Sequence, residues 1–305
     1  MPDEKIPVAR LWAWLAVAMS APLAHYSGGS WAALLIAGLA CWGIYGLMQN
    51  NRASEPPKSS VVCVLQIIWL CVLLSQMAAL TANYWPGRGS EVVVPTVMLA
   101  LAAWNCCGRP SRVAGVLFWI LTAMFVPVLL TGAKDVSPVW LLPENMDLSL
   151  AVVPILLLPH LALILPRQGK EERSKVGWIL VFGLSLWLIT AGVLSPAVAG
   201  KLDTPFRELS RSLELGAVSR FESVVSTAVT FGWFGLLSLV LECACVYGEA
   251  VRLKRKRCAW GIAAASAVLV VLHFKCQEWI LAVGSVILWI LQPVVKKCWK
   301  KKKTA

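Results

Sequence analysis

Two ionisable side chains lie inside long apolar segments of this sequence. Glu242 falls within an apolar run over about Val224–Gly248, and His160 falls within a run over about Leu148–Leu165. Ionisable groups in such segments are costly to bury and are therefore functional-site candidates. A carboxylate such as Glu242 can couple proton movement, and the imidazole of His160 titrates near neutral pH. The alternatives are a structural Glu held by hydrogen bonds and a His satisfied by a neighbouring carbonyl.

An amide side chain, Gln66, is a third candidate from a different segment. It lies with Gln76 in the apolar run over about Val61–Leu80. Glutamine in an apolar helix can hydrogen-bond to a neighbouring helix. We expect Gln66 and Gln76 mainly to join helices, with ligand contact by Gln66 as the alternative.

The segments that must position these side chains are typical of membrane-spanning helices. Of the 305 residues, 58% are hydrophobic and only 14% are charged, whereas soluble domains carry about 25% charged residues. A span needs about 20 apolar residues and must satisfy its own backbone hydrogen bonds, so each apolar run is predicted to be a helix. Ten runs are found, at about Val8–Leu23, Trp31–Met48, Val61–Leu80, Val92–Cys106, Val113–Leu130, Leu148–Leu165, Val176–Leu194, Val224–Gly248, Cys258–Phe274 and Trp279–Val295.

The distribution of lysine and arginine predicts the orientation of these helices. When successive loops are assigned to alternate sides of a membrane, 21 of the 28 Lys and Arg fall on one side and seven on the other. Positively charged loops are retained in the cytoplasm. The sequence therefore predicts an all-α polytopic protein of about ten helices with both termini cytoplasmic, ending in a basic tail over residues 296–305. Because no basic stripe lies along a soluble helix, we expect no nucleic-acid partner.

Motifs for enzyme chemistry are absent from the sequence. It has no Ser-His-Asp arrangement in a strand–turn–helix context, no HExxH and no phosphate-binding glycine loop. The ten cysteines include no CxxC pair and lie mostly inside apolar runs, where cysteine behaves as a small hydrophobic residue. We expect no enzymatic activity, no cofactor and no metal site.

One connecting segment has the pattern of a short amphipathic helix. Thr204 is a suitable N-cap, Pro205 suits the first helical position, and Gly216 can end the helix. Leu209 and Leu213 recur at helical spacing between charged residues. We expect a helix at the outer membrane surface that serves as an ordinary connection, with ligand contact as the alternative.

Several motifs in the second half of the chain match the order of a known family. The string from Thr204 to Glu222 presents Pro, Glu-Leu, Arg-Ser, Gly and then Arg-hydrophobic-acidic, just before the eighth predicted helix. Pro154 and Pro166 bracket the sixth helix, and Lys5-Ile6-Pro7 precedes the first. With these motifs and ten helices, the chain resembles the B-subunit family of spore germinant receptors, or spore germination permeases, of the amino acid–polyamine–organocation superfamily.

The resemblance implies an amino-acid-permease-like fold. It implies one transmembrane domain over residues 1–305, built from two inverted five-helix repeats at about residues 8–130 and 148–295. In such folds the first helix of each repeat is interrupted near the midplane, and the half-helix ends hold the ligand. Proline can create such a break. The ligand-binding candidates are Met19, Ser20, Ala21, Pro22, Gln66, Pro154, Ile155, Leu156, Leu157, His160 and Glu242.

The resemblance also implies a function and its partners. It implies a subunit in the bacterial spore inner membrane that senses a small nutrient such as an amino acid. Its partners would be an A-type membrane subunit, a C-type lipoprotein subunit and the lipid bilayer. After Pro154 the chain has Ile155-Leu156-Leu157 where the family has an aromatic, a Gly and an acidic residue. Two alternatives stay open, a proton- or sodium-coupled amino acid permease and a membrane scaffold without ligand binding.

Overall fold

Long helices dominate the part of the chain that the structure describes. The computed structural model describes residues 31–50, 59–85, 87–107, 110–141, 160, 170–199, 201–202, 204–212, 221–277 and 279–289. The helices are α2 (Trp31–Asn50), α3 (Ser60–Leu80), η1 (Thr81–Tyr84), α4 (Ser90–Cys107), α5 (Pro110–Gly132), η2 (Pro138–Leu141), α7 (Lys170–Leu194), α8 (Pro196–Ala199), α9 (Pro205–Ser212), α10 (Phe221–Ala250) and α11 (Arg255–Val271). A further helix covers Trp279–Trp289.

Each predicted apolar run among the described residues overlaps a helix. α3 differs from its predicted range by one residue, whereas α7 begins six residues before its predicted start at Val176. Among the described residues, three helical segments are long and apolar enough to cross a membrane, Ser60–Tyr84, Ser90–Cys107 and Ser223–Ala250. Shorter apolar helices cover Leu35–Gly46, Trp119–Gly132, Val181–Leu194 and Trp279–Trp289. The first predicted run and all of the sixth except His160 lie outside the described residues, so ten helices in two repeats remain a prediction.

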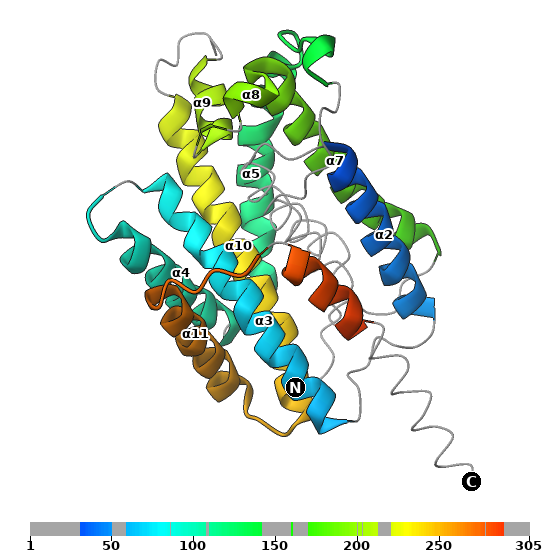
Figure 1. Cartoon of the computed structure of the whole chain (residues 1–305), viewed down its shortest axis with the longest axis vertical. Helices are drawn as coiled ribbons and strands as arrows, with labels where there is room; N and C mark the ends of the chain where they lie inside the picture. The colour runs from blue at the N-terminus through cyan, green and yellow to red at the C-terminus, as the bar shows by residue number, and fades with distance from the viewer. Residues whose placement is uncertain are drawn as a thin grey trace.

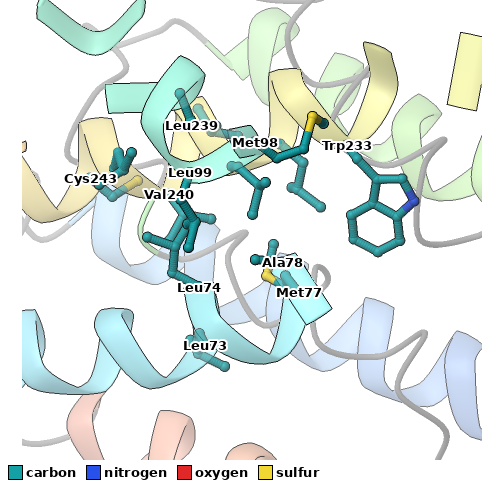
Figure 2. Packing of buried hydrophobic residues seen from close by; sticks show 14 of the residues in the cluster. Leu73, Leu74, Met77, Ala78, Met98, Leu99, Trp233, Leu239, Val240 and Cys243 are labelled. Carbon is teal, nitrogen blue, oxygen red and sulfur yellow. The ribbon is translucent and has the colours of Figure 1, made fainter. Parts of the chain in front are cut away.

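Four helices, α3, α4, α10 and α11, pack on one another as a group (Figure 1). α10 is its centre, and long stretches of it are buried on every side, which requires an apolar circumference. Figure 2 shows Leu74 of α3, Leu99 of α4 and Val240 of α10 in this core. We name α3, α4, α10 and α11 the four-helix group.

A second set of helices packs beside the four-helix group. α2 packs on α7, and α5 lies between α7 and α10 (Figure 1). The loop that follows α5 is tied to the end of α7, where the Ser137 amide donates to the Gly192 carbonyl at 2.9 Å. A Cβ added at Gly192 would lie 2.7 Å from a Val136 methyl, so glycine permits this close approach.

The outward faces of several helices are apolar. Val97, Leu101 and Trp104 form an exposed stripe on α4, and Trp119 of α5 and Val268 of α11 are also exposed. Water would leave such faces unfavourably hydrated, whereas lipid tails match them. Together with the apolar spans, these faces show a helical membrane protein.

α9 begins where the sequence predicted. The Thr204 carbonyl accepts hydrogen bonds from the Arg207 and Glu208 amides at 3.1 and 3.2 Å. Its apolar side, however, faces protein, because Phe206 and Leu209 are fully buried. The Phe206 ring lies 5.2 Å from that of Phe125 on α5, centroid to centroid. α9 therefore packs its apolar side on the bundle; its position at the outer membrane surface stays a prediction, and the predicted stop at Gly216 lies outside the described residues.

A tight turn joins α10 to α11 and brings the start of α11 back against α10. Arg252 adopts a left-handed backbone with φ of 66°, and the Leu253 amide donates to the Gly248 carbonyl at 2.9 Å. This six-to-one hydrogen bond ends α10 in the manner of a Schellman motif. Lys254 is extended, and α11 starts at Arg255. The turn therefore places the Arg255 side chain beside the last turns of α10.

Candidate functional site

His160 is fully buried between two aromatic side chains from different helices. Its Nε2 lies 3.1 Å from the Trp289 indole nitrogen, and its Nδ1 lies 3.3 Å from the Tyr247 hydroxyl oxygen on α10. An indole N–H can only donate, so Nε2 accepts this bond. The neutral imidazole then carries its proton on Nδ1 and donates it to Tyr247. Both ring nitrogens are occupied.

The aromatic rings also fix the orientation of the imidazole. The rings of Tyr247 and Trp289 each lie 6.0 Å from that of His160, at interplanar angles of 84° and 65°. Such edge-to-face contacts are favourable between aromatic rings. A ligand could reach His160 only after one of these contacts opens.

Gln66 meets the same region from α3. The side chain is fully buried, and its Nε2 donates to the Leu288 carbonyl at 3.2 Å. Leu288 directly precedes Trp289, so Gln66 and His160 bind consecutive residues of one helix. The Gln66 Oε1 atom is buried and has no hydrogen-bond partner within the described residues. Burying an unpaired acceptor costs about 1–3 kcal/mol. We name Gln66, His160, Tyr247 and Trp289 the His160 cluster.

Gln76 joins the last turns of α3 to a distant segment of the chain. Its Nε2 donates to the Phe274 carbonyl at 2.7 Å, and its Oε1 accepts from the Cys276 amide at 3.5 Å. Both acceptor and donor belong to the segment after α11. Gln66 therefore bridges two helices, as expected, whereas Gln76 ties α3 to the non-helical connection after α11.

Glu242 forms an ion pair with Arg255, a partner that the sequence pattern did not predict. The Arg255 Nη2 atom donates to Glu242 Oε1 in an ion pair, and the Cys106 thiol donates to Glu242 Oε2 at 3.3 Å. Arg255 Nη1 also donates to Glu249 at 3.2 Å, and its Nε donates to the Cys106 carbonyl at 3.4 Å. We name Arg255, Glu242, Glu249 and Cys106 the Arg255 hub.

The hub joins the ends of three helices of the four-helix group. Cys106 belongs to α4, Glu242 and Glu249 to α10, and Arg255 to α11. The Glu242 side chain is only 13% exposed and that of Arg255 36% exposed. A neighbouring cation and hydrogen bonds stabilise a carboxylate in such a place. Of the two roles expected for Glu242, the structure shows the hydrogen-bonded surroundings of a structural Glu and adds a charged partner; the coupling role stays a prediction.

The site candidates that the structure describes fall into two places, the Arg255 hub and the His160 cluster. Glu242 and Tyr247 are five residues apart on α10, and at about 100° per residue they point about 140° apart around the helix. The hub and the His160 cluster therefore occupy different faces of α10. The proline break candidates Met19, Ser20, Ala21, Pro22, Pro154, Ile155, Leu156 and Leu157 lie outside the described residues.

Three thiols also approach one another beside the hub. Cys106 and Cys245 lie 3.8 Å apart, sulfur to sulfur, and Cys258 of α11 is buried nearby against Gly248. No disulfide joins the cysteines that the structure describes. Among the residues that the structure describes, no set of three His, Cys, Asp or Glu side chains is placed to hold a metal ion.

The partners of these candidates were missed in the sequence for identifiable reasons. Arg255 was counted only as a loop charge, although the short turn before it was a signal that it could fold back on α10. Tyr247 and Trp289 bind His160 across 87 and 129 residues. Sequence spacing carries no signal for contacts at that separation.

Comparison with known proteins places the fold. The chain is similar in structure to MhsT, an amino acid transporter of the LeuT fold solved in complex with L-phenylalanine. The TM-score is 0.62 at 13% sequence identity, and the match covers 95% of this chain and 87% of MhsT. The chain has a transporter-like membrane fold. Neither protein-family models nor curated protein sequences give a match, so the likeness lies in the structure.

Proposed function

We propose that this protein binds a small nutrient, with an amino acid as the first class to test. One observation carries the proposal: the likeness to MhsT, which was solved with a bound amino acid, extends over 95% of the chain. A local likeness could arise from any pair of packed helices. A likeness over nearly the whole chain requires the same order and packing of many helices. The proposal involves no enzymatic step.

The proposed ligand position is between the first and sixth predicted helices, α3 and α10. Transporter folds place ligands near the bilayer midplane, beside interrupted helices whose half-helix ends are free to bind them. Pro22 and Pro154 are the break candidates for those helices. In this proposal α3 and α10 would form the opposite wall, where the Gln66 Oε1 atom on α3 is a buried acceptor without a partner in the described part of the chain. A ligand ammonium or hydroxyl group would satisfy such an acceptor.

In the conformation described, the His160 cluster would close this site rather than contact the ligand. Both His160 nitrogens are occupied by groups on α10 and on the helix Trp279–Trp289. Movement of the segment that carries His160 would break both hydrogen bonds. The cluster therefore links the sixth predicted helix to the four-helix group in the conformation described.

At finer detail, we propose the role of a nutrient-sensing subunit of a spore germinant receptor. The support is the string from Thr204 to Glu222, whose first part forms α9 beside α10. In this role the protein would lie in the spore inner membrane with both termini cytoplasmic. It would signal through an A-type membrane subunit and a C-type lipoprotein subunit.

A proton- or sodium-coupled amino acid permease is the second candidate, favoured by the same likeness to MhsT. The two roles differ in one measurable property. A permease moves its ligand when it is alone in a membrane, whereas a receptor subunit binds the ligand and needs its partners to produce a response.

Reconstitution of the full chain in proteoliposomes separates these roles. Saturable uptake of L-phenylalanine or another labelled amino acid by the protein alone would establish the permease and reject the receptor role. Binding without uptake, together with loss of nutrient-triggered germination on deletion of the gene, would establish the receptor subunit. Neither binding nor uptake for any amino acid would reject both and leave a scaffold without ligand binding, for which Ile155-Leu156-Leu157 is the sequence argument.

A further inference from the structure

The turn between α10 and α11 carries a dense group of basic side chains. Five of its six residues from Arg252 to Arg257 are Lys or Arg. Arg252, Lys254, Lys256 and Arg257 are exposed, and none of them has an ion-pair partner within the described residues. We name these four residues the basic turn.

Arg255, the fifth basic residue of this segment, is already paired within the hub. It binds two carboxylates, Glu242 and Glu249, so the three side chains together carry one net negative charge. The four cations of the basic turn exceed that charge by three. Uncompensated cations so close together repel one another and attract an anionic partner.

An exposed apolar path continues directly from these cations. Leu253, at the tip of the turn, is 49% exposed, and Trp260, one turn into α11, is 39% exposed. Ala264, Val268 and Val271 follow on α11 and are also exposed. From Trp260 to Val271 the helix rises about 16 Å at 1.5 Å per residue, close to half of the ~30 Å hydrocarbon thickness of a bilayer.

The neighbouring helix extends the same surface. α11 packs along α4, and the hub ties the last turn of α4 to Arg255. At that end of α4 the Trp104 side chain is 74% exposed. Tryptophans at the ends of spans sit at the level of lipid headgroups. The surface thus presents, in order, cations for an anionic headgroup, aromatic rings at the headgroup level and apolar surface for the acyl chains of one leaflet.

We propose that the basic turn and the exposed face of α11 bind an anionic phospholipid. The phosphate and any further acidic group of the head contact Arg252, Lys254, Lys256 and Arg257. An acyl chain lies along Trp260, Val268 and Val271. A free phosphate or a nucleic acid would use the cations and leave the apolar path unused, whereas a lipid uses both. This binding is independent of the nutrient site and of the proposed function.

The test compares two variants with the same change in charge. The first replaces Arg252, Lys254, Lys256 and Arg257 by Gln. The control replaces four exposed cations elsewhere, Arg88, Lys134, Lys201 and Lys275, by Gln. Purified full-length protein is titrated with phosphatidylglycerol and with phosphatidylcholine, and bound lipid is counted by native mass spectrometry. We expect affinity for phosphatidylglycerol to fall at least roughly tenfold in the first variant, because each Lys or Arg near the headgroup contributes to the attraction of anionic lipid. In the control, whose four cations lie elsewhere, the affinity should stay within about twofold of the wild type.

Two further arms identify the source of the anion. Trp260→Gln should weaken phosphatidylglycerol binding and leave binding of inorganic phosphate unchanged. If inorganic phosphate competes fully with the lipid, the site binds free anions and the lipid proposal is overturned. Equal loss of lipid in both four-fold variants, or equal affinity of the wild type for both lipids, would also overturn it. Should the first variant not remain monodisperse, Lys254→Gln with Lys256→Gln replaces it under the same criteria.

Discussion

At the scale of single residues, Arg255 does what only an arginine could do at its position. Its guanidinium donates in three directions, to Glu242, to Glu249 and to the Cys106 carbonyl. Lysine presents a point charge on a flexible stem and cannot hold a planar fork. The three acceptors belong to α4 and α10, so one side chain of α11 connects three helices.

The first prediction concerns the ion pair within this hub. Glu242→Gln removes the charge that Arg255 faces and should lower the free energy of unfolding by about 1–2 kcal/mol, since hydrogen bonds to charged groups contribute about 1.5–3 kcal/mol and the exposed third of Arg255 reduces the effect by solvent screening. Thermal unfolding in detergent measures it. In a double-mutant cycle with Arg255→Gln, the two losses should be less than additive.

The matched control is the pair of Glu208 and Arg211, 3.8 Å apart on α9. Glu208→Gln should change stability by less than about 0.5 kcal/mol, as surface pairs do. Fully additive losses in the Glu242 cycle would mean that the pair does not couple. Altered ligand response in Glu242→Gln, with stability unchanged, would instead assign the carboxylate the coupling role that the sequence suggested.

The second prediction concerns His160. His160→Leu removes the acceptor of the Trp289 N–H and the donor to Tyr247. Hydrogen bonds between membrane helices contribute about 0.6–1.7 kcal/mol each, so the loss should be about 1–3 kcal/mol. His160→Gln, which keeps a donor and an acceptor, should lose less. His273→Asn, at an exposed position with φ of 50°, is the control and should be neutral. Equal stability of His160→Leu and the wild type would contradict the hydrogen bonds described.

At the scale of elements, α10 and α11 approach closely because of one glycine. A Cβ placed on Gly248 would overlap the Cys258 sulfur. The third prediction is that Gly248→Ala destabilises the protein by about 1–3 kcal/mol, as overpacking does in a filled core. Cys258→Ala removes that sulfur, so the double variant should recover most of the loss. Gly261→Ala, with nothing within 4 Å of its added Cβ, is the control. Failure of Cys258→Ala to rescue would place the strain elsewhere.

Helices were predictable from the sequence, whereas their contacts were not. The span of α3 over Ser60–Leu80 and the start of α9 at Pro205 follow from hydropathy and from capping chemistry, which are local. The face that α9 buries is not local: Phe206 meets Phe125 from a helix some 80 residues earlier. Likewise, Glu242 was recognisable as an ionisable residue in an apolar run, but its partner depended on the geometry of the turn at Arg252. For Gln66 the residue type alone indicated helix bridging, because an apolar surrounding leaves few other partners.

At the scale of the whole molecule, the helices divide into the four-helix group and the packed pair α2 and α7, with α5 between them (Figure 1). The Arg255 hub lies inside the four-helix group and strengthens it as a unit. The His160 cluster instead connects that group to the sixth predicted helix.

The fourth prediction tests the orientation of this assembly. Single cysteines replacing Lys254 and Lys134 are labelled from outside intact cells with a membrane-impermeant maleimide, after native cysteines have been blocked or replaced. Both positions are exposed and lie in turns. The charge distribution predicts that Lys254 lies in the cytoplasm and Lys134 outside. Only the cysteine at position 134 should react with the maleimide. Labelling at position 254 alone would contradict the predicted orientation and indicate the reverse one.

The fifth prediction tests the central claim, that the transporter-like fold binds an amino acid. The measurement is equilibrium binding of each of the common L-amino acids, L-phenylalanine included, to the purified full-length protein in lipid nanodiscs. We expect saturable binding of at least one of them. Ala21→Trp and Leu156→Trp, placed at the two predicted helix breaks, should abolish it, while Lys201→Gln at an exposed site should not. Absence of saturable binding for every amino acid, in a preparation that is monodisperse and folded, would contradict the account.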